Sequence, residues 1–229
     1  MANAATAVHR SPKKALPWIL TPVLLLILSI GLVMMVYLLM PSHKLQSYLN
    51  LAFMDSLKVT STTAGLNIVN KDIDTGDQRP TTDTGKIITP KFGEQYAKLV
   101  CDDIALTVSV YFGTTKELLA LGACQSTQSA VLGNKDNVVI SAHVNTYFAD
   151  LDEMETGDIV VLYTEYGKFT YRVKEQIRFP KTDKRYIVPT GTDRLTLYTC
   201  EGDVLGDSDN RVGVICDLVS KEYFVPADE

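Results

Sequence analysis

The chain has few of the features that mark a nucleic-acid-binding protein. Its formal net charge is −5, and no extended cluster of Lys and Arg follows the first 14 residues. Binding to nucleic-acid phosphates requires a basic surface, so the composition argues against nucleic acid as a partner. The sequence also contains no internal repeat and no low-complexity segment.

Cysteine and histidine are scarce, and their spacing is unlike that of a metal site. No C-x-x-C pair occurs, and His143 is the only histidine outside the N-terminal segment. Structural zinc sites take four Cys or His ligands, usually in closely spaced pairs, so we expect no bound zinc. The four cysteines of the chain are Cys101, Cys124, Cys200 and Cys216.

Charge is absent from the hydrophobic stretch between Ala15 and Ser42. At about 1.5 Å per residue in a helix, this stretch exceeds the roughly 30 Å hydrocarbon thickness of a bilayer. Three basic residues lie in the last five positions before it, which favours a cytoplasmic N-terminus. A cleaved signal peptide would be shorter and would end in small residues, whereas Met40-Pro41-Ser42 stands here. We therefore predict a cytoplasmic tail (1–14), a transmembrane anchor (15–42) and an extracellular domain, in single-pass type II topology.

The predicted extracellular part begins with a stalk and linker, residues 43–86. Apolar residues at four-residue spacing between Leu45 and Leu57 are typical of an amphipathic helix. Asn70 to Lys86 is rich in Asp, Thr, Gly and Pro, which is typical of a flexible linker or an exposed loop. The extracellular part is long enough for one domain with a sizeable core.

Residues 87–229 contain short apolar runs, rich in β-branched and aromatic residues, between turn signals. This pattern predicts a mostly β domain, an antiparallel sandwich or barrel. Short helical pieces are expected at Lys116–Leu121 and between Phe148 and Met154. The predicted strands are Ile104–Phe112, Val138–Ala142, Ile159–Tyr163, Phe169–Ile177, Arg194–Thr199 and Val212–Val219.

Three residues next to predicted strands have the chemistry of a cysteine acyl-transfer site: Cys200, His143 and Arg211. Cysteine attacks as its thiolate, and His143 can give the proton that a departing amine needs. Arg211 can donate N–H groups to the negative charge that develops on the carbonyl oxygen. Singly, each residue has an ordinary alternative: a buried thiol, a packed imidazole or a solvated charge. If Cys200 is the nucleophile it must stay reduced, so at most one disulfide can form among the other cysteines.

The context of these residues resembles the sortases, cell-surface transpeptidases of Gram-positive bacteria. Thr196-Leu197-Tyr198-Thr199-Cys200 matches the T-L-x-T-C signature of that family, with Arg211 at a typical distance. Asn137 to His143 resembles the strand that leads to the sortase histidine, although Ala142 replaces the glycine often found there. The F-x-x-L…G-D spacing that follows is repeated by Phe148, Leu151, Gly157 and Asp158.

This resemblance, over residues 100–220, implies a closed sortase-like β-barrel and a thioacyl mechanism. Cys200 would attack the threonine carbonyl of an LPXTG-like sorting signal on a surface protein. An amine of a cell-wall precursor, or a pilin lysine, would then resolve the intermediate. Thr199 and Ser141 match positions that line the sortase peptide groove, with ordinary strand packing as the alternative.

The resemblance also bears on the subtype. Pilus-building sortases often carry a lid with an Asp-Pro-aromatic motif and a second membrane span. Here no aromatic residue follows Gln78-Arg79-Pro80, and the chain stops soon after Pro226, so a lid-less anchoring sortase is favoured. The segment Arg178–Asp193 corresponds in position to the sortase loop that helps choose the signal, or is a plain surface loop.

No cofactor is expected, with one alternative. An acidic group follows His143, and we favour a solvated surface turn over a Ca²⁺ site because the group lacks the order of an EF-hand loop. Its members are Asp150, Asp152, Glu153 and Glu155.

Three other functions use the same sequence features. A cysteine peptidase would hydrolyse the same intermediate with water. An L,D-transpeptidase is disfavoured because its arginine would be expected almost directly after the cysteine, where Glu201 stands. A non-enzymatic, membrane-tethered β-domain would bind a wall component and would tolerate replacement of Cys200.

Overall fold

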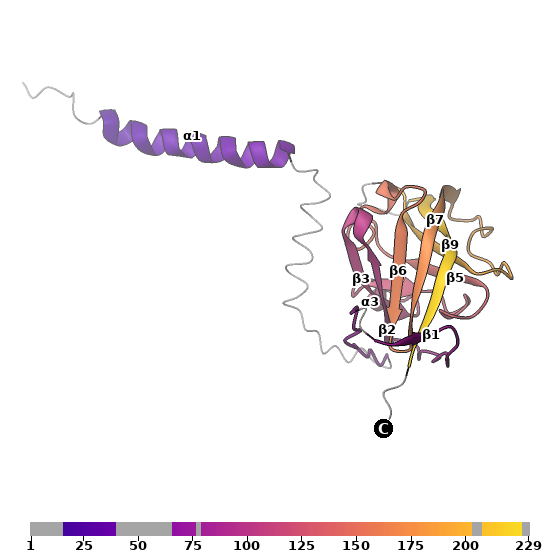
Figure 1. Ribbon diagram of the computed structural model, residues 1–229. Coiled ribbons are helices and arrows are strands. Elements are labelled where there is room, and N and C mark those ends of the chain that lie inside the picture. Colours follow the sequence, from indigo (N-terminus) through magenta and orange to yellow (C-terminus); the bar gives the residue numbers. More distant parts are fainter. Residues whose placement is uncertain (1–15, 40–65, 77–78, 203–207, 226–229) are drawn as a thin grey trace, which may run out of the picture. The chain divides into compact units, whose positions relative to one another are not determined.

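The computed structural model describes residues 16–39, 66–76, 79–202 and 208–225. The chain divides into two units, Met1–Leu45 and Gln46–Glu229, which are considered separately. The first contains helix α1, Leu16–Leu39 (Figure 1). Its side chains are described at positions 23–32 and 34–35. Within the residues so described, no helix meets the length and apolarity of a membrane span, and the anchor at 15–42 stays a prediction.

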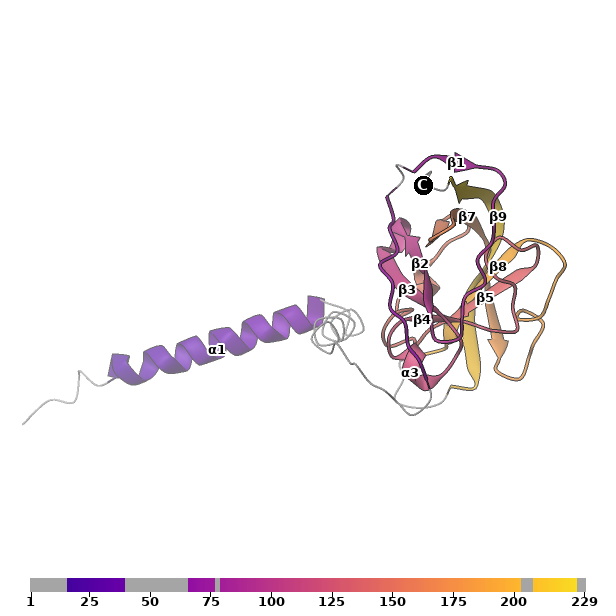
Figure 2. The same ribbon diagram turned by 90° about the horizontal axis from the view of Figure 1, so that it is seen from below.

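The second unit is built on one nine-stranded sheet in the order β1-β9-β7-β6-β2-β3-β4-β5-β8. A further pairing between β8 and β9 closes strands β2 to β9 into a barrel, which Figure 2 shows from below. All neighbouring strands are antiparallel except the pairs β3–β4 and β5–β8. The predicted closed, mostly β barrel with short helices is confirmed.

Six strands of the sheet correspond to the six that the sequence predicts. Three others were not expected: β1 and β4 are only two and three residues long, and the half-buried face of β2 includes apolar Val100, so polar residues do not alternate along it. The strands are β1 (Thr81–Thr82), β2 (Gln95–Cys101), β3 (Leu106–Phe112), β4 (Ala123–Gln125), β5 (Asn137–Ser141), β6 (Ile159–Thr164), β7 (Gly167–Pro180), β8 (Arg194–Cys200) and β9 (Asn210–Phe224).

Short helices occupy the connections. Helix α3 (Lys116–Leu119) is capped at its N-terminus by Thr115, whose hydroxyl accepts a hydrogen bond from the backbone N–H of Leu118. The 3₁₀ turn η1 (Asp102–Ile104) ends at Ala105, which adopts a left-handed conformation (φ 52°). The predicted strand from Ile104 is therefore wrong in its first two residues, because the chain turns there before β3 begins.

The connection from β5 to β6 packs onto the barrel core. It contains the 3₁₀ turn η2 (Leu151–Glu153), and Phe148, Leu151 and Met154 are at most 1% exposed. These side chains belong to the same cluster of buried residues as Leu195 and Leu197 of β8. The three apolar positions that predicted a helical piece are therefore the buried face of this connection.

The segment before the barrel also contacts it. Ile73 is 3% exposed, and Lys71 forms ion pairs with Glu94 and Glu165. Strand β1 pairs with the C-terminal end of β9, opposite Tyr223 and Phe224. Residues 70–86 were expected as a linker or exposed loop. The part of this range that the structure describes, 70–76 and 79–86, is largely exposed but is attached to the barrel at several points.

Candidate active site

Cys200 and Arg211 are a directly opposed pair of the β8–β9 ladder. Cys200 is the last residue of β8, and Arg211 is the second residue of β9. Side chains of opposed residues in antiparallel strands project to the same face, with Cβ atoms roughly 4.5–5.5 Å apart. The structure therefore brings the predicted nucleophile and the predicted oxyanion donor onto one face.

His143 reaches the same end of the barrel by another route. Strand β5 runs parallel to β8, with Ser141 opposite Tyr198, so both strands end together. Beyond the ladder, the Thr199 hydroxyl donates a 2.8 Å hydrogen bond to the carbonyl of Ala142. The residue before His143 is thus bound to the residue before Cys200. His143 itself is exposed.

The turn that contains His143 closes on its own backbone. The His143 carbonyl accepts a hydrogen bond from the backbone N–H of Phe148 at 3.1 Å. Phe148 is 1% exposed and is anchored in the core. The imidazole is therefore carried by a short turn fixed at Ala142 on one side and at Phe148 on the other.

The four thiols differ in reactivity because they differ in burial. None forms a disulfide, and Cys101, Cys124 and Cys216 are buried while Cys200 is half-buried. Burial raises the pKa of Cys124 to about 12 and also raises the pKa of Cys101 and of Cys216. A thiol attacks as thiolate, so these three are inert at neutral pH and Cys200 is the thiol available for chemistry.

The guanidinium of Arg211 is oriented by the connection between β8 and β9. Its Nη1 donates hydrogen bonds to the carbonyls of Ser208 at 2.7 Å and Asn210 at 2.9 Å. Both bonds use the same nitrogen of the guanidinium. The sequence predicted the arginine but not these two partners, since backbone carbonyls have no sequence signature.

Glu201, the residue after Cys200, also has a specific partner. Its Oε1 lies 2.8 Å from Nε of Arg178 on β7. Arg178 pairs across the ladder with Val212, which in turn pairs with Thr199. This ion pair therefore bridges the ends of β7 and β8 beside Cys200, and sequence reasoning did not find it.

The face that carries Cys200 continues into an apolar cluster outside the main core. Ile177, Phe179 and Ile215 are buried there, and Tyr186 and Tyr198 pack against them. The Phe179 ring lies 5.1 Å from the Tyr186 ring and 6.0 Å from the Tyr198 ring, between centroids. A buried apolar cluster, with Tyr186 and Tyr198 partly exposed at its edge, thus lies along β7, β8 and β9 on the face of the thiol.

The two residues that the resemblance assigns to substrate binding lie on opposite faces. Ser141 is partly buried and pairs with Tyr198, on the face of Cys200. Thr199 is 2% exposed and its hydroxyl is bonded to Ala142. The geometry therefore gives Thr199 a positioning part, in support of the His143 turn, and leaves Ser141 beside the apolar cluster.

The loop between β7 and β8, residues 181–193, is bonded to the barrel through the carbonyl of Tyr186. Asn137 Nδ2 donates to this carbonyl at 3.0 Å, and Arg194 Nη2 donates to it at 3.1 Å. The hydroxyl of Thr196 lies 3.1 Å from the same carbonyl and 2.9 Å from Asn137 Oδ1. Asn137 and Thr196 are both at most 1% exposed. The loop that carries Tyr186 is thus held by buried polar groups of β5 and β8.

Asp136 fixes the second half of this loop. Its Oδ1 accepts backbone N–H bonds from Thr190 at 2.6 Å, Asn137 at 2.7 Å and Gly191 at 3.1 Å. These bonds to the charged form, that of Thr190 above all, lower the pKa of the Asp136 carboxyl. The Asp136 carboxylate thereby holds this half of the loop beside β8.

The acidic group after His143 was the candidate for Ca²⁺. Over the residues that the structure describes, no three Asp, Glu, His or Cys side chains gather as they would around a metal ion. The group instead spreads along η2 and the turn that follows, where Asp158 accepts a bond from the backbone N–H of Glu155.

Comparisons with known proteins agree with this geometry. The family model described as Sortase domain matches residues 99–219, more than half of the chain. No curated protein sequence matches the chain.

Three solved structures share the fold with a TM-score of 0.52 each. The Clostridium perfringens sortase D5 transpeptidase is 21% identical, covering 57% of this chain and 82% of its own. Sortase A of Listeria monocytogenes is 23% identical, with 57% and 91% covered. Sortase C of Streptococcus pneumoniae is 23% identical, with 60% and 74% covered. With a Sortase domain over most of its barrel and the fold of three sortases, the chain belongs to the sortase family of cysteine transpeptidases.

Proposed function

We propose that this sortase cleaves an LPXTG-like sorting signal through a thioacyl intermediate on Cys200 and transfers the acyl group to an amine. The amine belongs to a cell-wall precursor or to a pilin lysine. One observation carries the proposal: Cys200 is paired with Arg211 on the ladder, and the residue before His143 is bonded to the residue before Cys200.

In the first half-reaction, the Cys200 thiolate attacks the carbonyl carbon of the threonine in the signal. A C–S bond forms, and Arg211 donates N–H groups to the oxygen that becomes negative. When the tetrahedral intermediate collapses, the peptide C–N bond breaks. His143, as imidazolium, gives its proton to the departing amine and becomes neutral.

In the second half-reaction, the acceptor attacks the thioester as a neutral amine. The new C–N bond forms, the C–S bond breaks and Cys200 leaves as thiolate. Neutral His143 takes the proton that the nitrogen loses, which restores the starting imidazolium. The protein is regenerated, and these steps need no cofactor.

The apolar cluster is the surface that we assign to the sorting signal. It lies on the face of Cys200, where Tyr186 and Tyr198 are partly exposed, Phe179 is buried against them and Ser141 pairs with Tyr198. The leucine and proline of an LPXTG-like signal are apolar, so they suit such a surface, and Ser141 can offer a hydroxyl to the peptide backbone.

Membrane anchoring is part of the same proposal. It rests on the charge-free stretch 15–42, the basic residues before it and the 24-residue helix α1. Type II topology would hold the barrel on the extracellular side, where sorting signals emerge.

The described part of the segment before the barrel supports the lid-less anchoring type. Its pairing with β9 involves Tyr223 and Phe224, at the end of that strand remote from Arg211. A lid would instead have to lie over Cys200.

Intact-mass spectrometry of the full chain in detergent, mixed with LPXTG-like peptides with or without triglycine, tests the proposal. We expect a thioacyl adduct that becomes an amide product when triglycine is present. Cys200→Ala should form no adduct, whereas the control Cys101→Ala should form it normally. If the thioacyl adduct were released at the same rate with and without triglycine, the result would indicate a peptidase. No adduct on Cys200, shown to be reduced by a thiol probe, would favour a binding domain.

A further inference from the structure

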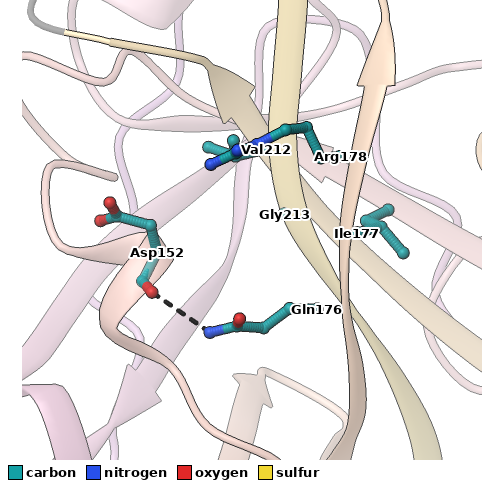
Figure 3. A pocket seen from close by; sticks show the side chains of 6 residues that line it. All are labelled: Asp152, Gln176, Ile177, Arg178, Val212 and Gly213. Atoms are coloured by element: carbon teal, nitrogen blue, oxygen red, sulfur yellow. Dashed lines mark hydrogen bonds between the residues drawn. The ribbon is translucent and has the colours of Figure 1, made fainter.

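The connection that begins at His143 is attached at its downstream end to β7. Gln176 Nε2 donates hydrogen bonds to the carbonyls of Asp152 at 3.2 Å and Met154 at 2.5 Å (Figure 3). A pocket of about 420 Å³ opens beside these bonds, and neither Cys200 nor His143 lines it. This attachment therefore holds the end of the connection that is far from His143 in the chain. The pocket is lined by Asp152, Gln176, Ile177, Arg178, Val212 and Gly213.

The upstream end, the turn that carries His143, is attached to helix α3 instead. Tyr147, the residue before the buried Phe148, is partly buried and packs against the barrel core. Its hydroxyl donates a hydrogen bond of 3.3 Å to the carbonyl of Ala120, the residue at the C-terminal end of α3. Burial and then the nearby Cys124 thiol raise the pKa of the Tyr147 hydroxyl, so it keeps its proton at neutral pH. Tyr147 therefore links the His143 turn to α3 and to β4.

Helix α3 is held on the barrel by a second apolar cluster, which we call the α3 cluster. Leu118 of the helix and Cys124 of β4 are fully buried in it, and Tyr111 of β3 is 4% exposed. Apolar residues of α3, of its connection to β4 and of the segment before the barrel pack against these three. They are Leu66, Ile68, Leu119 and Leu121.

The α3 cluster continues the face of the barrel that carries Cys200. Cys124 of β4 is opposed to Ser141 of β5, and Ser141 is opposed to Tyr198 of β8. Opposed residues project to the same face, and Tyr198 shares a face with Cys200 because one residue separates them. In the order of the strands, Cys200 thus lies between the apolar cluster of β7 to β9, which we assign to the signal, and the α3 cluster.

Residues 66–71, before the barrel, complete the α3 cluster with two of its apolar members. Figure 2 shows this segment beside α3 and β3. The hydroxyl of Tyr111 donates a 2.8 Å hydrogen bond to Asn70 Oδ1. Burial first, and then the neighbouring Tyr147, raises the pKa of Tyr111 to about 12. The two tyrosines therefore connect the segment with the His143 turn.

Backbone and ionic contacts fix this segment on the barrel. The backbone N–H of Val69 donates to the Gly93 carbonyl at 3.2 Å, and the Val69 carbonyl accepts from the N–H of Gln95 at 2.8 Å. Lys71 Nζ lies 2.7 Å from Glu165 Oε2, in the turn between β6 and β7. Residues 66–71 are thus a fixed part of the domain.

We propose that Tyr147 is a positioning residue for His143, and that residues 66–71 support it through the α3 cluster. This inference rests on the proposed function, in which His143 gives a proton to the departing amine. Thr199 and Phe148 fix the turn on the side of the barrel core, and Tyr147 fixes it on the side of α3. Without Tyr147 the turn can shift, and the imidazole then meets the departing nitrogen less often. The segment before the barrel thereby contributes to catalysis without touching the substrate.

Steady-state cleavage of a fluorogenic LPXTG-like peptide by the full chain in detergent tests this inference. Tyr147→Leu removes the ring and the hydroxyl, and we expect kcat to fall about five- to twentyfold, since a misplacement of about 1 Å can cost roughly 10²-fold. The peptide KM should stay unchanged. Tyr147→Phe keeps the ring and should lower kcat by about threefold at most. Ile68→Ala loosens the α3 cluster and should lower kcat about two- to fivefold.

A second substrate distinguishes positioning of His143 from general damage to the site. A thiophenyl ester of the same signal releases a thiolate, which departs without a proton, so thioacyl formation from it needs no general acid. We expect Tyr147→Leu and Ile68→Ala to form the Cys200 adduct from this ester at the rate of the unmodified chain, measured by intact-mass spectrometry. Equal losses with the peptide and with the ester would overturn the positioning role.

Ile73→Ala is the matched control, since Ile73 is a buried residue of the same segment that lies outside the α3 cluster. It should lower the unfolding temperature and leave kcat unchanged. A loss of kcat equal to that of Ile68→Ala would overturn the contribution of the α3 cluster. An unchanged kcat in Tyr147→Leu, with a native circular dichroism spectrum, would overturn the inference and leave the proposed function standing. Failure of the unmodified chain to form an adduct from either substrate would overturn the proposed function itself.

Discussion

The three candidate catalytic residues reach one end of the barrel by two different means. Cys200 and Arg211 occupy opposed positions of a regular antiparallel ladder, where backbone hydrogen bonds set their separation. His143 lies outside any strand and depends on the bond from Thr199 to Ala142 and on the buried Phe148. Residues on a ladder are placed by the sheet, whereas a residue on a turn needs side chains to place it.

The two threonines of the T-L-x-T-C motif extend this contrast. Thr199 faces the barrel interior and binds the turn before His143. Thr196 faces the other side and donates to Asn137, whose side-chain amide in turn donates to the carbonyl of Tyr186 in loop 181–193. The motif thus ends in the nucleophile, and each of its two threonine hydroxyls helps to hold a separate loop near that nucleophile.

The largest effect is expected from removing the residue on the turn. His143→Ala should lower kcat for peptide cleavage by about 10²- to 10⁴-fold, because the departing amine loses its proton donor. The measurement is steady-state cleavage of a fluorogenic sorting peptide, with His43→Ala as the control. Near-normal turnover would show that His143 is not the general acid.

Breaking the bond that holds the turn should have the next largest effect. Thr199→Val keeps the volume but leaves the buried Ala142 carbonyl without its donor, which costs about 1–3 kcal/mol of unfolding free energy. We expect kcat to fall roughly tenfold, a change of the same order as that free energy, while the peptide KM stays unchanged. Thr107→Val, on the exposed face of β3, is the control for stability and kinetics. Lowered stability with an unchanged kcat would mean that Thr199 has no positioning effect on His143.

A smaller and different effect is expected at the other threonine. Thr196→Val deprives buried Asn137 of a hydrogen-bond donor and loosens loop 181–193, so the peptide KM should rise about three- to tenfold with kcat kept. Trypsin cleavage after Lys184 or Arg185 should also become faster. Equal KM values and equal cleavage rates in the variant and the unmodified chain would contradict this function of Thr196.

The smallest effect is expected when the pH is lowered. The pKa of Asp136 is lowered below its ordinary value of 3.8 by the N–H bonds to its charged form, so its hold on the loop is complete above pH 3.8. That contribution is lost as the pH falls through the lowered pKa. The amide NMR signals of Thr190 and Gly191 should therefore shift below pH 3.8, and Asp136→Asn should abolish this step. The same transition in the variant would assign the shift to another group.

Much of the barrel was predictable from local patterns. Strands β3 and β5 to β9 have runs of β-branched and aromatic residues long enough to be recognised, and Cys200, His143 and Arg211 were found from residue type and order. The short strands β1 and β4 were missed because two or three residues carry no period. Strand β2 was missed because its half-buried face includes apolar Val100, so the sequence shows no alternation of polar and apolar residues there.

The sequence by itself determined the mostly β character, the catalytic residue types and the charge-free N-terminal stretch, since these depend on periodicity and chemistry along the chain. Only the tertiary structure decided which threonine holds which loop, that Arg178 bonds to Glu201, and that the connection after His143 forms a pocket with β7 and β9. These contacts join residues far apart in the chain, many through backbone carbonyls that every residue type possesses. Closure of the barrel brings them together, and no local pattern records it.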